Sequence, residues 1–385
     1  MRECATTAPW ATTTTAPGST LDELDLELIT ALQVAPRAPW SQLAGPLGVD
    51  AATLSRRWAR LRDSGTAWVT CYMGASQVAY GALALIEVNC LPRDREALAA
   101  ECAGHPQALS VEMVAGSSDL LLTVAARHRA TMVDYVLALG KIPGVTGTRT
   151  HLVQFLHREA SQWRFDSLSR DQQRGLPGPG AGPRPDPGPI TSEERRLILA
   201  LAPDGRRSLV SLAAELGRPE ATVRRLLAGV LGSGKAVLRC EAAQPHTGWH
   251  TSFTVWMSVP PAQLARAAGE LAALRDTRLS ASTATEANLL AVVWAHGTND
   301  IARYEARLAA TIPDLRVLNR AVTLRWVKRM GRMMGPDGRS QGCVPMDVWA
   351  NPHAYIGRAR GAGAGRDPSA SDPPDTRRAV SGRCR

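Results

Sequence analysis

The sequence predicts an α+β protein of two similar units, each with three short helices followed by a β-α-β-β-α-β segment. Three observations support this prediction. A short basic helix with both ends marked lies at 51–64, behind a two-helix lead-in. Alternating strand and helix patterns follow it, and the whole pattern returns about 169 residues later. The 385 residues exceed one ordinary hydrophobic core, so two or more domains are expected.

The lead-in consists of two helices. Leucines at helical spacing and acidic residues in the first turn predict a helix from Leu21, which the prolines at 36 and 39 end. A second short helix is expected at 41–47. Gly48 then turns the chain into the basic helix, and this order is typical of a helix-turn-helix.

The basic helix has an apolar and a polar face. Asp50 is suited to cap its first amides and Gly65 to end it in the left-handed conformation. Leu54, Trp58 and Leu61 form a stripe that faces a core. The opposite face carries Thr53, Ser55, Arg56, Arg57 and Arg60. Such a face suits phosphates and base edges, although an isolated helix of this kind can simply present a solvated basic surface.

Behind this helix, the composition of 67–72 favours a strand that could form a small wing. Further strands are expected at 81–90, 108–114, 120–125 and 147–156, and helices at 94–102 and 131–139. The order β-α-β-β-α-β matches the ferredoxin-like split unit, an antiparallel sheet with two helices on one face.

A proline- and glycine-rich stretch at 175–189 can bury nothing and predicts a linker. Beyond it, 209–217 mirrors 40–48 and 220–227 mirrors 51–58. Ile142-Pro143 returns as Ile312-Pro313, so the offset holds over the whole unit and indicates an internal duplication. The second unit is expected to have strands at 251–259, 279–285, 289–295 and 317–327, and helices at 263–274 and 300–311.

The expected domains are therefore a disordered leader at 1–20, a winged helix-turn-helix at 21–73 and a ferredoxin-like domain at 78–160. A Pro/Gly linker at 170–190, a divergent winged helix-turn-helix at 191–240 and a second ferredoxin-like domain at 249–330 follow. The last expected segment, 331–385, lacks periodicity and is interpreted as a disordered basic tail.

Composition narrows the function classes. The formal charge of +10 makes a polyanionic partner plausible without separating nucleic acid from a membrane surface. No apolar run approaches a membrane span, and the leader lacks the order of a signal peptide. Seven scattered cysteines, with no Cys/His cluster at metal-ligand spacing, are typical of reduced thiols in a cytoplasm. No metal and no cofactor are expected.

Several motifs together carry a family resemblance: Leu21-Asp-Glu-Leu-Asp25 before the helix-turn-helix, Arg56-Arg57, Ser64-Gly65, and Gly116-x-x-Asp119-Leu-Leu. With this element order, the chain resembles the Lrp/AsnC family of bacterial transcription regulators over about 21–160 and, more weakly, 190–330. The tandem form is similar to double-unit members of actinobacteria. The resemblance implies a RAM domain, which is ferredoxin-like, pairs through its sheet and binds a small effector, often an amino acid.

The resemblance also implies site residues. Arg57 and Arg60 are expected at phosphates, and Thr53, Ser55 and Arg56 at base edges. The effector is expected at the loop of Gly116, Ser117, Ser118 and Asp119, where exposed amides and a carboxylate could hold an amino acid. An ordinary hairpin turn is the alternative for this loop.

The second copy departs from the first. Leu226 and Gly229 replace Arg57 and Arg60, so its helix keeps only Arg224 and Arg225. Thr285 and Asn288 replace Gly116 and Asp119. We therefore expect weaker DNA binding, an altered or absent effector site, and a mainly assembling role for this copy.

Two other function classes stay open. Siroheme decarboxylases share this fold and use basic and histidine side chains around a tetrapyrrole, and His151 and His157, six apart on one strand, are the only histidine pair of interest. A ligand-blind regulator or a protein–protein assembly module is the other. The basic reading helix favours a cytoplasmic, non-enzymatic regulator. It would bind double-stranded DNA and not membranes, as a homo-oligomer or as a pseudo-dimer within one chain.

Overall fold

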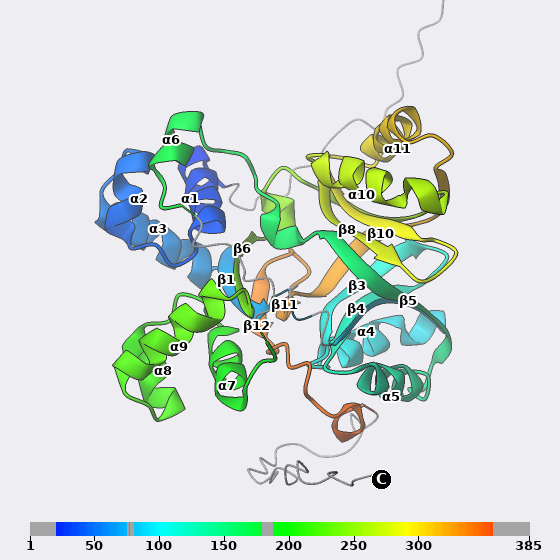
Figure 1. Ribbon diagram of the computed structural model, residues 1–385, viewed down its shortest axis with the longest axis horizontal. Coiled ribbons are helices and arrows are strands. Elements are labelled where there is room, and N and C mark those ends of the chain that lie inside the picture. The colour runs from blue at the N-terminus through cyan, green and yellow to red at the C-terminus, as the bar shows by residue number, and fades with distance from the viewer. Residues whose placement is uncertain (1–20, 75–76, 78–80, 179–187, 357–385) are drawn as a thin grey trace, which may run out of the picture.

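The computed structural model describes residues 21–74, 77, 81–178 and 188–356. Figure 1 shows short helices gathered on one side of the molecule, and a large sheet with further helices on the other. The predicted leader, part of the predicted linker and the end of the chain lie outside the described residues.

The first helix-turn-helix has the predicted elements. Helix α1 (Glu23–Val34) begins with a capping box between Asp22 and Asp25. Helices α2 (Trp40–Leu47) and α3 (Ala51–Asp63) follow, with Gly48 and Gly65 both at positive φ. The side chain of Asp50 accepts from Thr53 N, and Leu54, Trp58 and Leu61 are buried, so the predicted caps and stripe of α3 are confirmed.

The strand expected to form a wing pairs with a distant segment of the chain. Strand β1 (Ala67–Met73) runs antiparallel to β6 (Ala236–Ala242), from Ala67↔Ala242 to Met73↔Ala236. Strand β6 follows helices α7 (Ser192–Leu201), α8 (Leu209–Leu216) and α9 (Glu220–Gly232). This two-stranded sheet joins the two helix-turn-helix groups directly (Figure 1).

The first ferredoxin-like domain consists of six elements: β2 (Ala82–Cys90), α4 (Arg95–Ala103), β3 (Ala108–Gly116), β4 (Leu120–Ala126), α5 (Arg129–Leu139) and β5 (Val145–Arg158). Its strand order is β3-β4-β2-β5, which is the split β-α-β order predicted from the sequence. Helices α4 and α5 pack on one face of this sheet over Ile86, Leu122 and Val124.

Residues 251–329 repeat this order of elements: β7 (Thr251–Ser258), α10 (Leu264–Ala273), β8 (Thr277–Thr283), β9 (Leu289–Ala295), α11 (Asn299–Thr311) and β10 (Arg316–Arg329). Strand β5 pairs with β8, and β10 pairs with both β7 and β3. The eight strands therefore form a closed antiparallel sheet within one chain. Its inner face buries a core that includes Leu85, Leu121, Val153, Trp256 and Leu290.

The segment between the units differs from the prediction. Residues 170–178, expected to belong to a Pro/Gly linker, begin with helix α6 (Arg170–Gly175). Trp163, Phe165 and Leu176 are buried in the core of the first helix-turn-helix. The end of the first unit therefore packs against α1 and α2. The short-range periodicity of the sequence carries no signal for this long-range contact.

The structure also corrects the predicted tail. Strands β11 (Arg332–Met334) and β12 (Ser340–Cys343) form a hairpin, and a 3-10 turn, η6 (Pro352–Ala354), follows. Ser340 N donates to Gly65 O, and Met346 and Val348 are buried. Residues 331–356 are thus part of the fold. Backbone hydrogen bonds and a few buried apolar side chains hold this segment in place, and neither produces a regular hydrophobic period in the sequence. No helix in the described residues is long and apolar enough to cross a membrane.

Candidate functional site

Helix α3 presents the predicted polar face, but two of its arginines are bound to the chain itself. Arg57 Nη1 lies 2.5 Å from Asp22 Oδ2 and 2.9 Å from Asp25 Oδ1. Arg60 Nη2 lies 2.6 Å from both oxygens of Asp25, whose side chain is only 3% exposed. Hydrogen bonds to Asp22 and then Asp25 raise the pKa of Arg57. These arginines therefore clamp α3 to the start of α1.

Arg56 is placed differently. Its guanidinium donates to Thr53 Oγ1 at 3.0 Å, and Thr53 Oγ1 donates to Asp50 at 2.6 Å. Arg56 is exposed and forms no ion pair with any residue that the structure describes. Its position in the first turns of α3 leaves this cation the most available of the three for a base edge or a phosphate.

Helix α9 occupies the corresponding place in the second group, with Val223, Leu227 and Val230 buried. Arg224 is paired with Glu220 at 2.5 Å, whereas Arg225 is exposed. The ion pairs of Arg57 and Arg60 with Asp25 have no counterpart on α9 within the described residues. Instead Lys235, just after α9, places its Nζ 2.9 Å from Glu194 on α7. The two helices thus differ in both charge and support.

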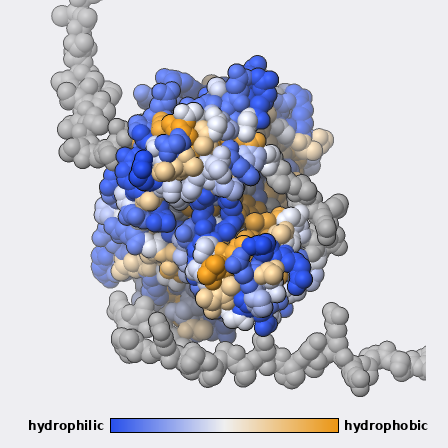
Figure 2. Space-filling model, turned by 90° about the vertical axis from the view of Figure 1, so that its left-hand side faces the viewer, coloured by the Kyte–Doolittle hydropathy of each residue, from blue (hydrophilic) through white to orange (hydrophobic). Residues whose placement is uncertain are grey.

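The face that carries both helix groups is largely hydrophilic, with small apolar patches (Figure 2). The β1–β6 pairing fixes the two groups side by side on this face. Such a face is suited to a polar partner.

The predicted effector loop is packed against the second domain. Gly116 has φ 147°, and a Cβ there would meet Arg320 O at 2.5 Å. Asp119 accepts from Cys90 N at 2.9 Å and forms an ion pair with Arg95. Its carboxylate is therefore already compensated, which does not fit the expected role of holding an amino group.

The serines of this loop border a buried polar network. Ser117 Oγ lies 3.2 Å from Glu87 Oε2 and 2.7 Å from Asn319 Nδ2. Ser118 is buried, and its hydroxyl has no hydrogen-bond partner among the described residues. Glu87 Oε1 lies 2.7 Å from His151 Nε2 inside the closed sheet.

The pairing of Glu87 with His151 was not predicted from the sequence, which pointed to His151 and His157 instead. Burial is the largest single effect and opposes ionisation of Glu87. The hydrogen bond and charge of His151, the charge of Arg149 and the hydrogen bond from Ser117 together outweigh it and lower the pKa of Glu87. His157 does not join them. Its Nε2 lies 3.1 Å from Ser282 Oγ, and its ring is tilted against that of Phe155, because bulges in the β5–β8 pairing break the strict alternation of faces.

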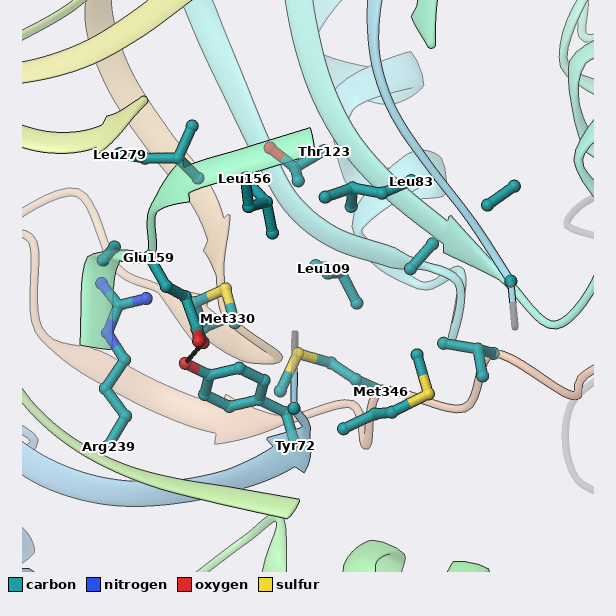
Figure 3. A pocket seen from close by; sticks show the side chains of 17 residues that line it. Tyr72, Leu83, Leu109, Thr123, Leu156, Glu159, Arg239, Leu279, Met330 and Met346 are labelled. Atoms are coloured by element: carbon teal, nitrogen blue, oxygen red, sulfur yellow. Dashed lines mark hydrogen bonds between the residues drawn. The ribbon is translucent and has the colours of Figure 1, made fainter. Parts of the chain in front are cut away.

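A pocket of about 90 Å³ lies between the β1–β6 sheet, the first ferredoxin-like domain and the C-terminal segment (Figure 3). Most of its wall is apolar and comes from several distant elements. It includes Met73, Leu83, Leu109, Leu156, Leu279 and Met346. Sequence patterns did not predict this pocket, because its wall combines both ferredoxin-like domains, the β1–β6 ladder and the C-terminal segment, which are far apart in the sequence.

One end of the pocket is polar. Tyr72, Glu159 and Arg239 lie together there, and Tyr72 OH donates to Glu159 Oε1 at 2.5 Å (Figure 3). Tyr72 and Arg239 are buried. Burial raises the pKa of Tyr72 and lowers that of Arg239. The described residues contain no cluster of three or more His, Cys, Asp or Glu side chains that could hold a metal ion.

Known proteins match the two parts of the first unit. Residues 21–62 match the AsnC-type helix-turn-helix domain, and residues 83–159 match the Lrp/AsnC ligand binding domain. Over 138 residues the chain is 30% identical to the HTH-type transcriptional regulator AldR of Mycolicibacterium smegmatis, a stretch covering 34% of this chain and 81% of AldR. The chain belongs to the Lrp/AsnC family of transcriptional regulators.

A second relative of this Lrp/AsnC protein is the HTH-type transcriptional regulator FL11 of Pyrococcus horikoshii, 27% identical over 143 residues. The match covers 37% of this chain and 95% of FL11. A curated single-unit relative thus corresponds to less than half of the present chain.

The crystal structure of the siroheme decarboxylase NirDL resembles a larger part of the chain. The TM-score is 0.53 at 16% identity, and the match covers 80% of this chain and 93% of NirDL. At this identity the likeness concerns the fold alone. The arrangement of both halves of this Lrp/AsnC-family chain therefore also occurs in an enzyme.

Proposed function

We propose that this Lrp/AsnC-family protein is a DNA-binding transcription regulator in which a tandem duplication has fused two family units into one chain. The observation that carries this proposal is the continuous pairing of the halves, through β1–β6, β5–β8 and β3–β10. The repeated order of elements supports the duplication. In this arrangement one chain presents two helix-turn-helix groups to one DNA molecule.

The reading of DNA is assigned chiefly to α3. Arg56, with Thr53 and Ser55, supplies the contacts to base edges near the start of the helix. Arg57 and Arg60 hold α1 and α3 together, and half-exposed Arg60 keeps a surface from which it can also approach a phosphate. On α9, Arg225 adds attraction to phosphates, and the second group binds more weakly.

The experiment is a gel shift with double-stranded DNA from upstream of the coding sequence, comparing wild type with Arg56→Ala. We expect the variant to bind at least about tenfold more weakly, because a contact to a base edge typically contributes 1–3 kcal/mol. Arg57 and Arg60 are left intact, because their removal would leave Asp25 buried with too little compensation and disturb the fold.

The matched control is Arg303→Ala. Arg303 is 77% exposed on α11 and, like Arg56, lies in a helix, but it pairs with Asp300 far from the reading face. Its loss should leave DNA affinity unchanged. If Arg56→Ala binds DNA as well as wild type does, with the same dependence on salt, the assignment of α3 as the reading helix is wrong.

A non-enzymatic role also belongs to this proposal, although the fold of NirDL makes a siroheme decarboxylase the second candidate. A tetrapyrrole with many carboxylates needs a large, strongly basic site. The pocket of Figure 3, with a volume of about 90 Å³, is too small for such a macrocycle, although Arg239 lies in its wall. Titration with siroheme should leave its visible absorption spectrum unchanged. A saturable shift of the main band would favour the enzyme.

An amino acid effector at Gly116–Asp119 stays a prediction. The buried hydroxyl of Ser118 favours a polar group nearby, but the ion pair of Asp119 with Arg95 must open before that carboxylate can bind an ammonium group. Calorimetric titration with the natural amino acids tests this site.

A further inference from the structure

Behind the polar end of the pocket, buried arginines outnumber buried carboxylates. Glu241 is the shared carboxylate of three buried arginines: Arg239, Arg278 and Arg329. Arg278 Nη2 lies 2.8 Å from Glu241 Oε1, while its buried Nη1 has no hydrogen-bond partner among the described residues. One carboxylate cannot neutralise three guanidinium groups, so a positive excess is buried here.

Two further arginines increase this excess. Arg158 donates to the carbonyl oxygens of Ala272 and Leu274, and Arg164 donates to the carbonyls of Ser161 and Trp163. Neither has an ion pair within the part of the chain that the structure describes. Burial, and after it the charge of Arg239, lowers the pKa of both Arg164 and Arg278.

Aromatic rings compensate part of this charge. The guanidinium of Arg278 lies 3.7 Å from the centre of the Trp294 ring, and that of Arg329 lies 4.6 Å from it. Rings stabilise a cation without cancelling its charge. Two other carboxylates lie nearby. Glu159, at the pocket wall, already accepts from Tyr72, and the charge of buried Glu112 acts on Arg329.

The pocket supplies the other half of a binding site. Its apolar wall lies next to the positive end, and Leu109, Leu156 and Leu279 are only half-buried, so a ligand can reach them. The volume corresponds to about seven water positions. This combination of an apolar channel and one cationic end matches a molecule with an apolar chain and a single negative group.

We propose that this pocket binds an amphipathic monocarboxylate of medium chain length, with its chain among the leucines and methionines and its carboxylate directed toward Arg239. The site is separate from the Gly116–Asp119 loop, and it takes a ligand without an ammonium group. The ligand carboxylate joins a cluster of five arginines that has three carboxylates of its own, Glu112, Glu159 and Glu241.

The position of the pocket gives the ligand a regulatory role, a conclusion that rests on the proposed function. Tyr72 and Arg239 come from β1 and β6, the strands that join the two helix-turn-helix groups, while the apolar wall comes mainly from the closed sheet (Figure 3). A ligand in the pocket therefore contacts both the β1–β6 sheet and the closed sheet. Its binding changes how the reading helices are held, and hence the affinity for DNA.

The first experiment measures binding by calorimetry on the full chain, with octanoate as the probe. Octanol and octylamine, of equal chain length, test the need for negative charge. We expect octanoate to bind, Arg239→Gln to weaken it at least tenfold, and Glu159→Gln to tighten it by removing a like charge. Binding of octylamine or octanol as tight as that of octanoate would overturn the assignment.

A second pair of variants tests the location. Leu109→Trp fills the pocket and should abolish binding, whereas Leu324→Trp, at a position 61% exposed elsewhere on the sheet, should not. Unchanged binding by a folded Leu109→Trp protein would overturn the proposed location. If that variant does not fold, the opposite effects of Arg239→Gln and Glu159→Gln decide instead, and equal affinities in both would overturn it.

A gel shift with and without saturating octanoate separates this inference from the proposed function. We expect DNA affinity to change at least threefold. Binding of octanoate in calorimetry without any change in DNA affinity would overturn the regulatory role, while the proposed binding site would still stand. Failure of the ligand-free protein to bind DNA would overturn the proposed function together with that role, while the pocket is decided by calorimetry alone.

Discussion

At the scale of single residues, Asp25 changes the interpretation of the basic helix. The sequence shows Arg56, Arg57 and Arg60 as one cationic face, and the resemblance assigns all three to DNA. In the structure, buried Asp25 binds both Arg57 and Arg60, and only Arg56 is left unpaired by acids. A helical pattern shows which residues share a face, but not which of them a carboxylate 32 or 35 residues away has already neutralised.

Glu112 on β3 is a residue whose ionisation should govern stability. It is 3% exposed and accepts from Thr323 Oγ1 at 2.5 Å. Burial raises the pKa of Glu112 to about 7. The folded state therefore holds this proton more tightly than the unfolded state, and this group's contribution to stability falls as pH rises from about 4.5 to about 7.

Glu112→Gln tests this expectation. The amide oxygen can still accept from Thr323, but it does not ionise. We expect the free energy of unfolding of the variant, relative to wild type, to rise by about 2 kcal/mol between pH 5 and pH 8. Urea unfolding at both pH values measures it. A difference between the two proteins that does not change with pH would contradict a raised pKa at this site.

At the scale of elements, the segment 331–356 acts as a brace between the layers. Its hairpin contacts the end of α3, where a Cβ on Gly65 would collide with Ser340 O. Arg332 donates to the carbonyl of Pro203, next to α7. Met346 and Val348 line the pocket beneath. One short segment thus touches both helix-turn-helix groups and the closed sheet.

Truncation should show this role. A chain that stops at Met330 loses the buried side chains of Met346 and Val348, and with them at least about 3 kcal/mol of stability. A chain that stops at Ile356 keeps the brace and should unfold at the wild-type temperature. Thermal unfolding followed by circular dichroism compares the three proteins. Equal melting temperatures for the two truncated chains would show that the hairpin does not stabilise the fold.

Most elements, but not their long-range partners, could be predicted from the sequence. Capped amphipathic helices such as α3 and alternating strands such as β4 have local signals, and the structure places both within a residue or two of the expected bounds. The β1–β6 ladder joins residues far apart in the chain, and one-letter patterns carry no signal for it. The pocket depends on that ladder and on the brace, so neither its wall nor Arg239 could be predicted.

At the scale of the whole molecule, the two sheets pair within one chain. The sequence left open whether they pair within or between chains, because the linker is long enough for either. The closed sheet leaves the edges of β5 and β3 covered by β8 and β10. Within the described residues, the second half of the chain therefore covers strand edges that the first half alone would leave open.

The first unit alone should recover such a partner by dimerising. Residues 21–178, expressed without the rest, expose the edges of β1, β3 and β5, each of which has unpaired backbone groups and adjacent apolar side chains. Exposed edges of this kind favour strand pairing with another chain. We expect this fragment to form a dimer in light scattering at micromolar concentration, while the full chain at the same concentration has the mass of one copy. A folded, monomeric fragment would show that the edges need no partner, and a full chain with the mass of two copies would show that fusion does not replace association between chains.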